Sequence, residues 1–212
     1  MPTRKKAAAP SRQAAYTARN RANLVLAGQQ VLAEIGQEAT IEQVAEIAQV
    51  SPTTIYKYFP NKELLFAEAL SQIWVEWVAW SYNGATPGES LEVVMNSARK
   101  LFWIKQTHPL FAKILHNTLS NPSFIIQAVS GPGRAVFKNL ADRGELAKDN
   151  FDIRLGVYAF SLGGILTSVH VTESISPSQA EVALGYALRI FEVSDAKIKK
   201  VISTKLEFAP TK

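Results

Sequence analysis

The stretch TIEQVAEIAQVSPTTIYKYFPNK, residues 40–62, contains the signals that decide the fold. Thr40 and Gln43 have the spacing of a capping box, which predicts that a helix begins directly after Thr40. A second, short helix should begin after Ser51, because serine caps helices and the proline that follows is tolerated at the first helical position. Pro60 should end that helix. Two helices around a tight turn, the second rich in hydroxyl groups, can present a recognition helix to the DNA major groove.

The same stretch resembles the N-terminal domain of the TetR family of transcriptional repressors. After an apolar helix and a glycine, the family pattern is T-x-x-x-I-A-x-x-A-G-V-S-x-x-T-x-Y-x-Y/H-F-x-x-K-x-x-L. The residues in register with this layout are Gly36, Thr40, Val44, Ala45, Ala48, Val50, Ser51, Ile55, Tyr56, Tyr58, Phe59, Lys62, Glu63 and Leu65. Gln49 departs from the pattern, because the family usually has glycine there and glycine favours a left-handed turn. The resemblance is strong over residues 20–66 and weaker, with a consistent layout, beyond them.

The resemblance implies that residues in and around the second short helix contact double-stranded DNA. The implied set is Thr40, Ser51, Pro52, Thr53, Thr54, Tyr56, Lys57, Tyr58 and Lys62. Pro52, Thr53, Thr54 and Lys57 would face base edges, and the tyrosines, Thr40 and Lys62 would hold phosphates. The alternative is a generic helical hairpin inside a core, but this would not require the cap, the turn and the Y-x-Y-F-x-x-K element to coincide.

Positive charge is concentrated before this motif. The whole chain has 23 basic and 18 acidic residues, but residues 1–21 contain six basic residues and no acidic one. The remainder therefore holds 17 basic against 18 acidic residues. We expect residues 1–15 to be a flexible arm that follows the phosphates or enters the minor groove, through Arg4, Lys5, Lys6 and Arg12. The alternative is a tail that only improves solubility.

The hydrophobic pattern predicts an all-α chain with no strand. A helix over about residues 16–35 should pack its apolar face, which includes Ile35, on Val44, Ile47, Ile55 and Phe59. We therefore predict a three-helix helix-turn-helix domain over residues 16–66. A helix that begins near Lys62 becomes apolar on nearly all sides and should connect this domain to a larger helical domain, residues 67–212, for ligand binding and dimerisation. Thr86 and Glu89 have the spacing of a further capping box.

Large aromatic residues are frequent in the middle of the chain. The resemblance implies a small-molecule pocket between these helices, although aromatic residues at helical spacing also suit an ordinary core. The candidate ligand-binding residues are Trp74, Trp77, Asn96, Arg99, Phe102, Trp103, Phe111, His116, Asn117 and Tyr158.

Two stripes of mainly small residues predict a helix-pairing surface, and the resemblance implies a homodimer built from the last two major helices. The candidate interface residues are Gly156, Ala159, Gly163, Thr167, Ala180, Ala183, Leu184, Ala187 and Phe191. In the alternative interpretation, both stripes are covered within one chain.

The sequence gives little support for an enzyme, a metal site or a cofactor. There is no cysteine, and His108, His116 and His170 are scattered without metal-ligand spacing. The uncharged run from Leu155 to Val171 is too short for a membrane span, and no signal peptide is evident, which predicts a cytoplasmic protein. We expect a ligand-responsive repressor that binds a palindromic operator as a dimer. The alternative is a helical ligand-binding or interaction module with a degenerate DNA-binding domain.

Overall fold

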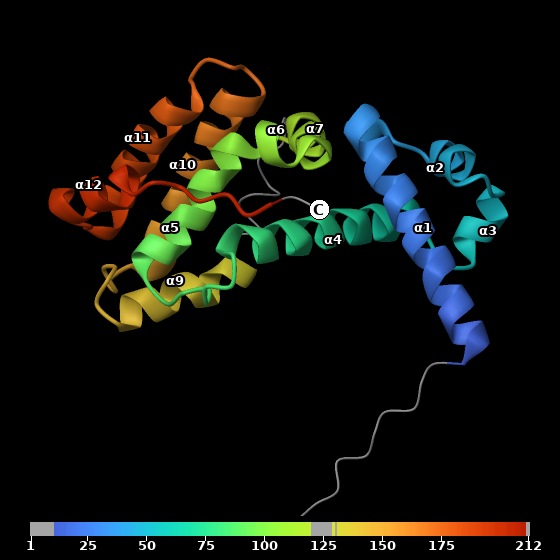
Figure 1. Ribbon diagram of the computed structural model, residues 1–212, viewed down its shortest axis with the longest axis horizontal. Coiled ribbons are helices and arrows are strands. Elements are labelled where there is room, and N and C mark those ends of the chain that lie inside the picture. The colour runs from blue at the N-terminus through green and yellow to red at the C-terminus, as the bar shows by residue number, and fades with distance from the viewer. Residues whose placement is uncertain (1–10, 120–128, 130, 211–212) are drawn as a thin grey trace, which may run out of the picture.

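The computed structural model describes residues 11–119, 129 and 131–210, and within these ranges the secondary structure is entirely helical. The N-terminal part contains α1, η1, α2 and α3, followed by the long helix α4, with bounds Arg12–Glu34, Gly36–Glu38, Ile41–Ala48, Pro52–Tyr56 and Lys62–Tyr82. Figure 1 shows α4 extending from the α1–α3 group on one side of the molecule to the remaining helices on the other. The position of α4 therefore affects both groups.

The larger group of helices follows α4 in the chain. Its elements are α5 (Leu91–Lys100), η2 (Leu101–Trp103), α6 (Ile104–Thr107), α7 (Pro109–Thr118), α9 (Pro132–Asp142), α10 (Phe151–His170), α11 (Pro177–Leu188), η3 (Arg189–Phe191) and α12 (Asp195–Ser203). Figure 1 shows α10, α11 and α12 at the end of the molecule opposite to α2 and α3. No helix within the described ranges is long and apolar enough to cross a membrane.

The predicted helix starts around the turn are confirmed. The Thr40 hydroxyl accepts a hydrogen bond from the Gln43 amide, and the Gln43 side chain accepts one from the Thr40 amide. The Ser51 hydroxyl caps α3 by accepting from the amide of Thr54 at 3.2 Å. Ile55 and Phe59 are fully buried under α1, so the turn is attached to the core of this group.

Several expectations about individual elements are wrong. Ile35 and Ile47 are 40% and 39% exposed, because α1 and α2 use neighbouring residues to form the core. The box at Thr86 does not open a helix, because Ser90 caps α5 instead and η2 follows α5 directly. Helix α12 was not predicted.

Gln49, at the C-terminal end of α2, adopts the left-handed conformation that glycine would favour at this position, with φ 55° and ψ 44°. This conformation is unfavourable for any residue with a Cβ atom, whereas glycine adopts it without that penalty. We expect Gln49→Gly to raise the free energy of unfolding by roughly 0.5–1 kcal/mol, the balance of relieved strain and greater flexibility of the unfolded chain. Chemical denaturation of both proteins measures this. A loss of stability would show that the Gln49 side chain contributes more than its backbone strain costs.

Because the His170 side chain is buried, we expect acid to destabilise the folded protein. Its ring is fully buried, with Nε2 2.8 Å from the Leu101 carbonyl oxygen and Nδ1 unpartnered within the described residues. Burial lowers the pKa of His170; Lys105 and His116 lower it further, whereas the Leu101 hydrogen bond and Glu173 oppose the shift. Because the unfolded chain binds this proton more readily, stability should fall as the pH drops from about 7 to about 5.

Unfolding measured by denaturant at several pH values tests this expectation. His170→Gln keeps a donor for the Leu101 carbonyl but cannot titrate, so its stability should depend less on pH over the same interval. The burial of His108 also lowers the pKa of that residue, so some dependence should remain. If the stability of His170→Gln falls as steeply with pH as that of the unaltered protein, His170 is not the source of the acid destabilisation.

Candidate functional site

Helix α3 has an exposed polar surface on one side and is anchored to the core on the other. Thr53 and Lys57 are exposed, Tyr56 is 50% exposed, and Pro52 and Thr54 are half-buried. The opposite side of the helix is held by Ile55, which is fully buried. The Ser51 and Thr54 hydroxyl oxygens lie 2.9 Å apart at the start of the helix, which stabilises its N-terminal end. The predicted base-facing residues therefore lie together on a rigid, accessible surface.

Three of the predicted phosphate-binding residues lie together beside α3. Thr40, Tyr56 and Lys62 line one surface recess, in which the N-terminal ends of α2 and α4 also meet. Lys62 Nζ lies 3.5 Å from the Ala39 carbonyl oxygen, next to Thr40. Helix N-terminal ends favour anions, although Glu42 and Glu63 also line the recess and weaken this preference. The recess has the polar groups that a phosphate requires.

Tyr58 and Arg21 have a positioning role within the domain. The Tyr58 hydroxyl accepts a hydrogen bond from Asn20 Nδ2 at 3.3 Å, and its carbonyl accepts one from Arg21 Nη1 at 2.9 Å. Arg21 also forms a two-point ion pair with Glu68 on α4 and lies over the Phe59 ring at 4.1 Å. Arg21 therefore links α1, the end of the α3 segment and α4.

The basic arm is only partly described. Arg12 lies exposed in the first turn of α1, whereas Arg4, Lys5 and Lys6 lie outside the described residues.

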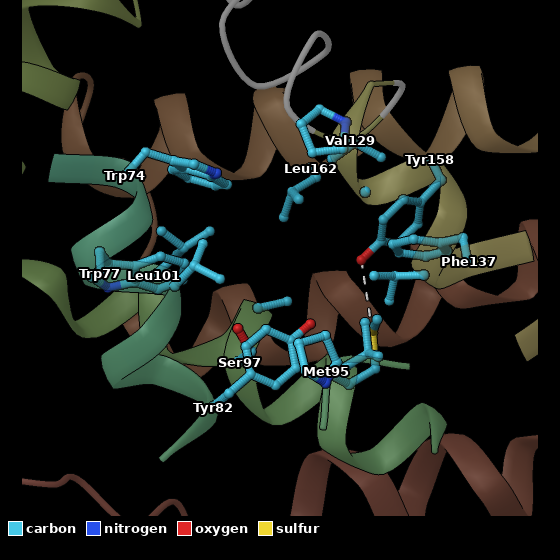
Figure 2. A pocket seen from close by; sticks show the side chains of 17 residues that line it. Trp74, Trp77, Tyr82, Met95, Ser97, Leu101, Val129, Phe137, Tyr158 and Leu162 are labelled. Carbon is cyan, nitrogen blue, oxygen red and sulfur yellow. Dashed lines mark hydrogen bonds between the residues drawn. The ribbon is translucent and has the colours of Figure 1, made fainter. Parts of the chain in front are cut away.

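A cavity of about 170 Å³ lies within the larger group of helices. Figure 2 shows Trp74 and Trp77 on one side of it and Phe137 and Tyr158 on the other. The lining side chains come from α4, α5, η2, α9, α10 and the segments that connect them. They are Trp74, Trp77, Val78, Tyr82, Pro87, Val94, Met95, Ser97, Ala98, Leu101, Val129, Pro132, Gly133, Val136, Phe137, Tyr158 and Leu162. Four of these, Trp74, Trp77, Val78 and Tyr82, belong to α4, whose N-terminal end lines the recess of Thr40, Tyr56 and Lys62.

Of the ten predicted ligand-binding residues, the structure brings Trp74, Trp77 and Tyr158 to this cavity. Phe102 and Phe111 are buried in the core, and His116 and Asn117 line a separate recess beside the end of α1. The other three belong to a polar cluster around the half-buried Glu181 carboxylate, namely Asn96, Arg99 and Trp103. Sequence reasoning missed Tyr82, Ser97 and Phe137 as lining residues, although the two aromatic ones belong to the same aromatic-rich region.

The predicted dimer stripes face the interior of the protomer instead of its surface. Ala159, Ala180, Leu184, Ala187 and Phe191 are each less than 9% exposed, because α10 and α11 pack against each other and against the core. Gly163 is also buried, whereas Gly156, Thr167 and Ala183 are half-buried. The alternative, that the stripes are covered within one chain, therefore describes most of these residues correctly.

A different face of α10 and α11 is exposed and apolar. Ile153, Val157 and Phe160 are 69%, 49% and 63% exposed along one side of α10, and Val182 and Tyr186 are 48% and 62% exposed on α11. A Cβ atom added at Gly156 or Gly164 would meet no other atom within 4 Å. We refer to Ile153, Val157, Phe160, Gly164, Val182 and Tyr186 as the α10–α11 face.

Known proteins resemble this chain in its N-terminal sequence and in its overall fold. Residues 24–69 match the family described as bacterial regulatory proteins, tetR family. No curated protein matches the chain. Similar solved structures include RolR in complex with resorcinol, with 18% identity and a TM-score of 0.64, over 92% of this chain and 98% of that one.

Two further structures extend this comparison. SmeT, the repressor of the Stenotrophomonas maltophilia multidrug efflux pump SmeDEF, is 16% identical with a TM-score of 0.67, over 90% of this chain and 97% of that one. The fatty acid degradation regulator FadR from Bacillus halodurans is 18% identical with a TM-score of 0.58, over 86% and 97% of the two chains. At these identities the likeness shows the fold, and the N-terminal match provides the sequence relationship. Residues 24–69 of this chain therefore match the tetR family of bacterial regulatory proteins, and the chain as a whole has the fold of the regulators RolR, SmeT and FadR.

Proposed function

We propose that the protein is a repressor that binds a palindromic operator as a homodimer and is released by a small, largely apolar effector. The observation that carries the proposal is the exposed polar face of α3, fixed by the buried Ile55 and flanked by the recess of Thr40, Tyr56 and Lys62. Thr53 and Lys57 would read bases, and the recess would hold a phosphate of the same duplex.

The length of α3 favours a dimer. A recognition helix of five residues reaches few base pairs, so useful specificity requires two copies on half-sites about 34 Å apart or a multiple of this. The α10–α11 face supports the pairing: its apolar side chains are exposed in one protomer, and a second copy of the same face would cover them in a two-fold arrangement. Its place at the end of the molecule opposite to α2 and α3 leaves both DNA-reading surfaces free (Figure 1).

Helix α4 supports the ligand response. A molecule bound against Trp74 and Trp77 would contact α4 directly. The N-terminal half of α4 is bound to α1 through the Arg21–Glu68 ion pair and through Gln29 Nε2, which donates to the Ala69 carbonyl at 3.1 Å. A tilt of α4 would therefore move the α1–α3 group. The effector must bind the DNA-free arrangement more tightly, because equal affinity for both arrangements would shift nothing.

Selection of duplexes from a random DNA pool by the purified protein tests this proposal. The expected product is an inverted repeat, and the selected sequence should change in the half-site when Thr53→Ala is used. Affinity for the selected duplex should fall steeply with salt, since phosphate contacts release counterions. No enrichment of any sequence, together with a flat salt dependence, would favour the helical interaction module with a degenerate DNA-binding domain.

A further inference from the structure

The cavity against Trp74 and Trp77 has a size and chemistry that define a ligand class. A dry protein cavity of about 150 Å³ lined by apolar side chains accommodates benzene. The volume here is about 170 Å³, which fits one ring with small substituents. Trp77, Met95, Leu101 and Tyr158 are at most 3% exposed, so a molecule among them is largely removed from water.

The walls of the cavity favour a flat molecule. Trp74 and Trp77 lie with ring centroids 5.4 Å apart on one side, and Phe137 and Tyr158 lie 5.1 Å apart on the other. Figure 2 shows the two pairs facing each other across the space. An aromatic ring between them would make stacked or edge-to-face contacts with both pairs.

The described part of the cavity lining carries no charged side chain. The described residues that line the cavity include no Asp, Glu, Lys, Arg or His. Residues 120–130 also contain none of these residue types in the sequence. The nearby buried cations on α5 are already engaged: Arg99 by Glu181, and Lys100 by the Ser81 carbonyl oxygen at 2.7 Å. A buried carboxylate or ammonium group would therefore lack a counterion and would cost much of the binding free energy.

The hydroxyl groups among the lining side chains remain protonated. Figure 2 shows the Tyr158 hydroxyl directed into the space, where the only acceptor drawn for it is Met95 Sδ, at 3.7 Å. A thioether sulfur is a weak acceptor, so an oxygen atom of a ligand would be a better partner for this proton. Burial raises the pKa of both Tyr158 and Tyr82. Both hydroxyls are therefore hydrogen-bond donors at neutral pH.

We propose that this cavity binds an uncharged, single-ring aromatic molecule whose oxygen accepts a hydrogen bond from Tyr158. The proposal rests on the proposed ligand response and specifies which chemical class produces it. Trp74 and Trp77 would hold the ring, and Tyr158 would select molecules that carry an oxygen over pure hydrocarbons of the same shape.

Four toluenes that differ in one para substituent test the class by calorimetric titration of the full-length protein. They are 4-methylphenol, 4-methylbenzoate, 4-methylbenzylammonium and p-xylene. We expect 4-methylphenol to bind at least about tenfold more tightly than either ion, because neither charge is compensated in the cavity. Tyr158→Phe should weaken 4-methylphenol binding severalfold and leave p-xylene binding unchanged, since only the hydrogen bond is lost.

Two further variants test whether the probes bind in this cavity. Tyr16→Phe is the matched control, because Tyr16 is 52% exposed on α1 and should not alter binding of any probe. Ala98→Leu adds bulk to the lining and should weaken 4-methylphenol and p-xylene alike. Equal or tighter binding of 4-methylbenzoate, binding of none of the probes, or an unchanged 4-methylphenol affinity in Tyr158→Phe would overturn the ligand class.

A second measurement separates this inference from the proposed function. Fluorescence anisotropy of the labelled operator shows whether each probe releases the protein from DNA. If 4-methylphenol binds as expected but does not release DNA, the ligand class stands and the proposed response is wrong. If the operator binds with the expected salt dependence but charged probes bind best, the DNA-binding function stands and the ligand class is wrong.

Discussion

Phe160→Asp is expected to convert the proposed dimer to a monomer and to lower operator affinity at least about 100-fold. Phe160 is 63% exposed in the middle of the α10–α11 face, between Val157 and Gly164. In a two-fold dimer the same side chain occurs twice, so two carboxylates would be buried in an apolar interface without partners. Each monomer would retain one α3 and therefore one half-site. Sedimentation velocity and fluorescence anisotropy measure the two effects.

Val75→Asp is the matched control for this substitution. Val75 is 61% exposed on α4 and lies outside the α10–α11 face, so the same change should leave the dimer intact. Because both residues are exposed in the single chain, both variants should fold. If Phe160→Asp remains a dimer of normal operator affinity, the two-fold axis does not pass through the α10–α11 face.

Arg99→Met is expected to cause the largest loss of stability, about 3 kcal/mol, as is usual when one partner of a buried ion pair is removed. The side chains of Arg99 and Glu181 are 4% and 14% exposed. Arg99 Nη2 donates to Glu181 at 2.7 Å, and Nη1 donates to the carbonyl oxygens of Val201 and Thr204 at 2.8 and 2.9 Å. Methionine retains the bulk but leaves the carboxylate and both carbonyls without this donor. Denaturant unfolding measures the change.

Two companion variants show whether burial is the reason. Arg134 pairs with Asp152 on the surface, where the two side chains are 45% and 70% exposed, so Arg134→Met should change stability little. The double variant Arg99→Met/Glu181→Met should recover part of the loss, because it removes the uncompensated charge as well as its partner. Equal effects of Arg99→Met and Arg134→Met would contradict this explanation.

Local features of the sequence predicted the α2–α3 region well. The Thr40 box, the Ser51 cap and the proline after it act within one helical turn, and each was found where expected. The departure at Gln49 left two outcomes open, a strained turn or a differently shaped one, and the structure has the left-handed turn. The exposure of Ile47 was not predictable, since a short helix with several apolar residues does not reveal which of them a neighbouring helix will cover.

Features that depend on contacts between distant helices were predicted less well. The small residues Ala159 and Ala180 permit close packing, but spacing alone does not distinguish a neighbour in the same chain from one in a second chain. Arg99 was proposed as a ligand anchor because a polar residue in an apolar region suggests function, whereas its partner Glu181 is 82 residues away in the sequence. The cavity could not be predicted in full for the same reason, because its walls come from helices that are far apart along the chain.

The most direct test of DNA reading by α3 is the affinity of the triple variant Tyr56→Phe/Lys57→Ala/Lys62→Ala for the selected operator. Lys113→Ala/Lys148→Ala, which removes the same number of positive charges from exposed positions in the larger group of helices, is the control. We predict that the triple variant binds at least about 100-fold more weakly with a shallower salt slope, and that the control binds like the unaltered protein. Normal operator binding by the triple variant would contradict the assignment of α3 and its adjoining recess as the DNA-reading surface.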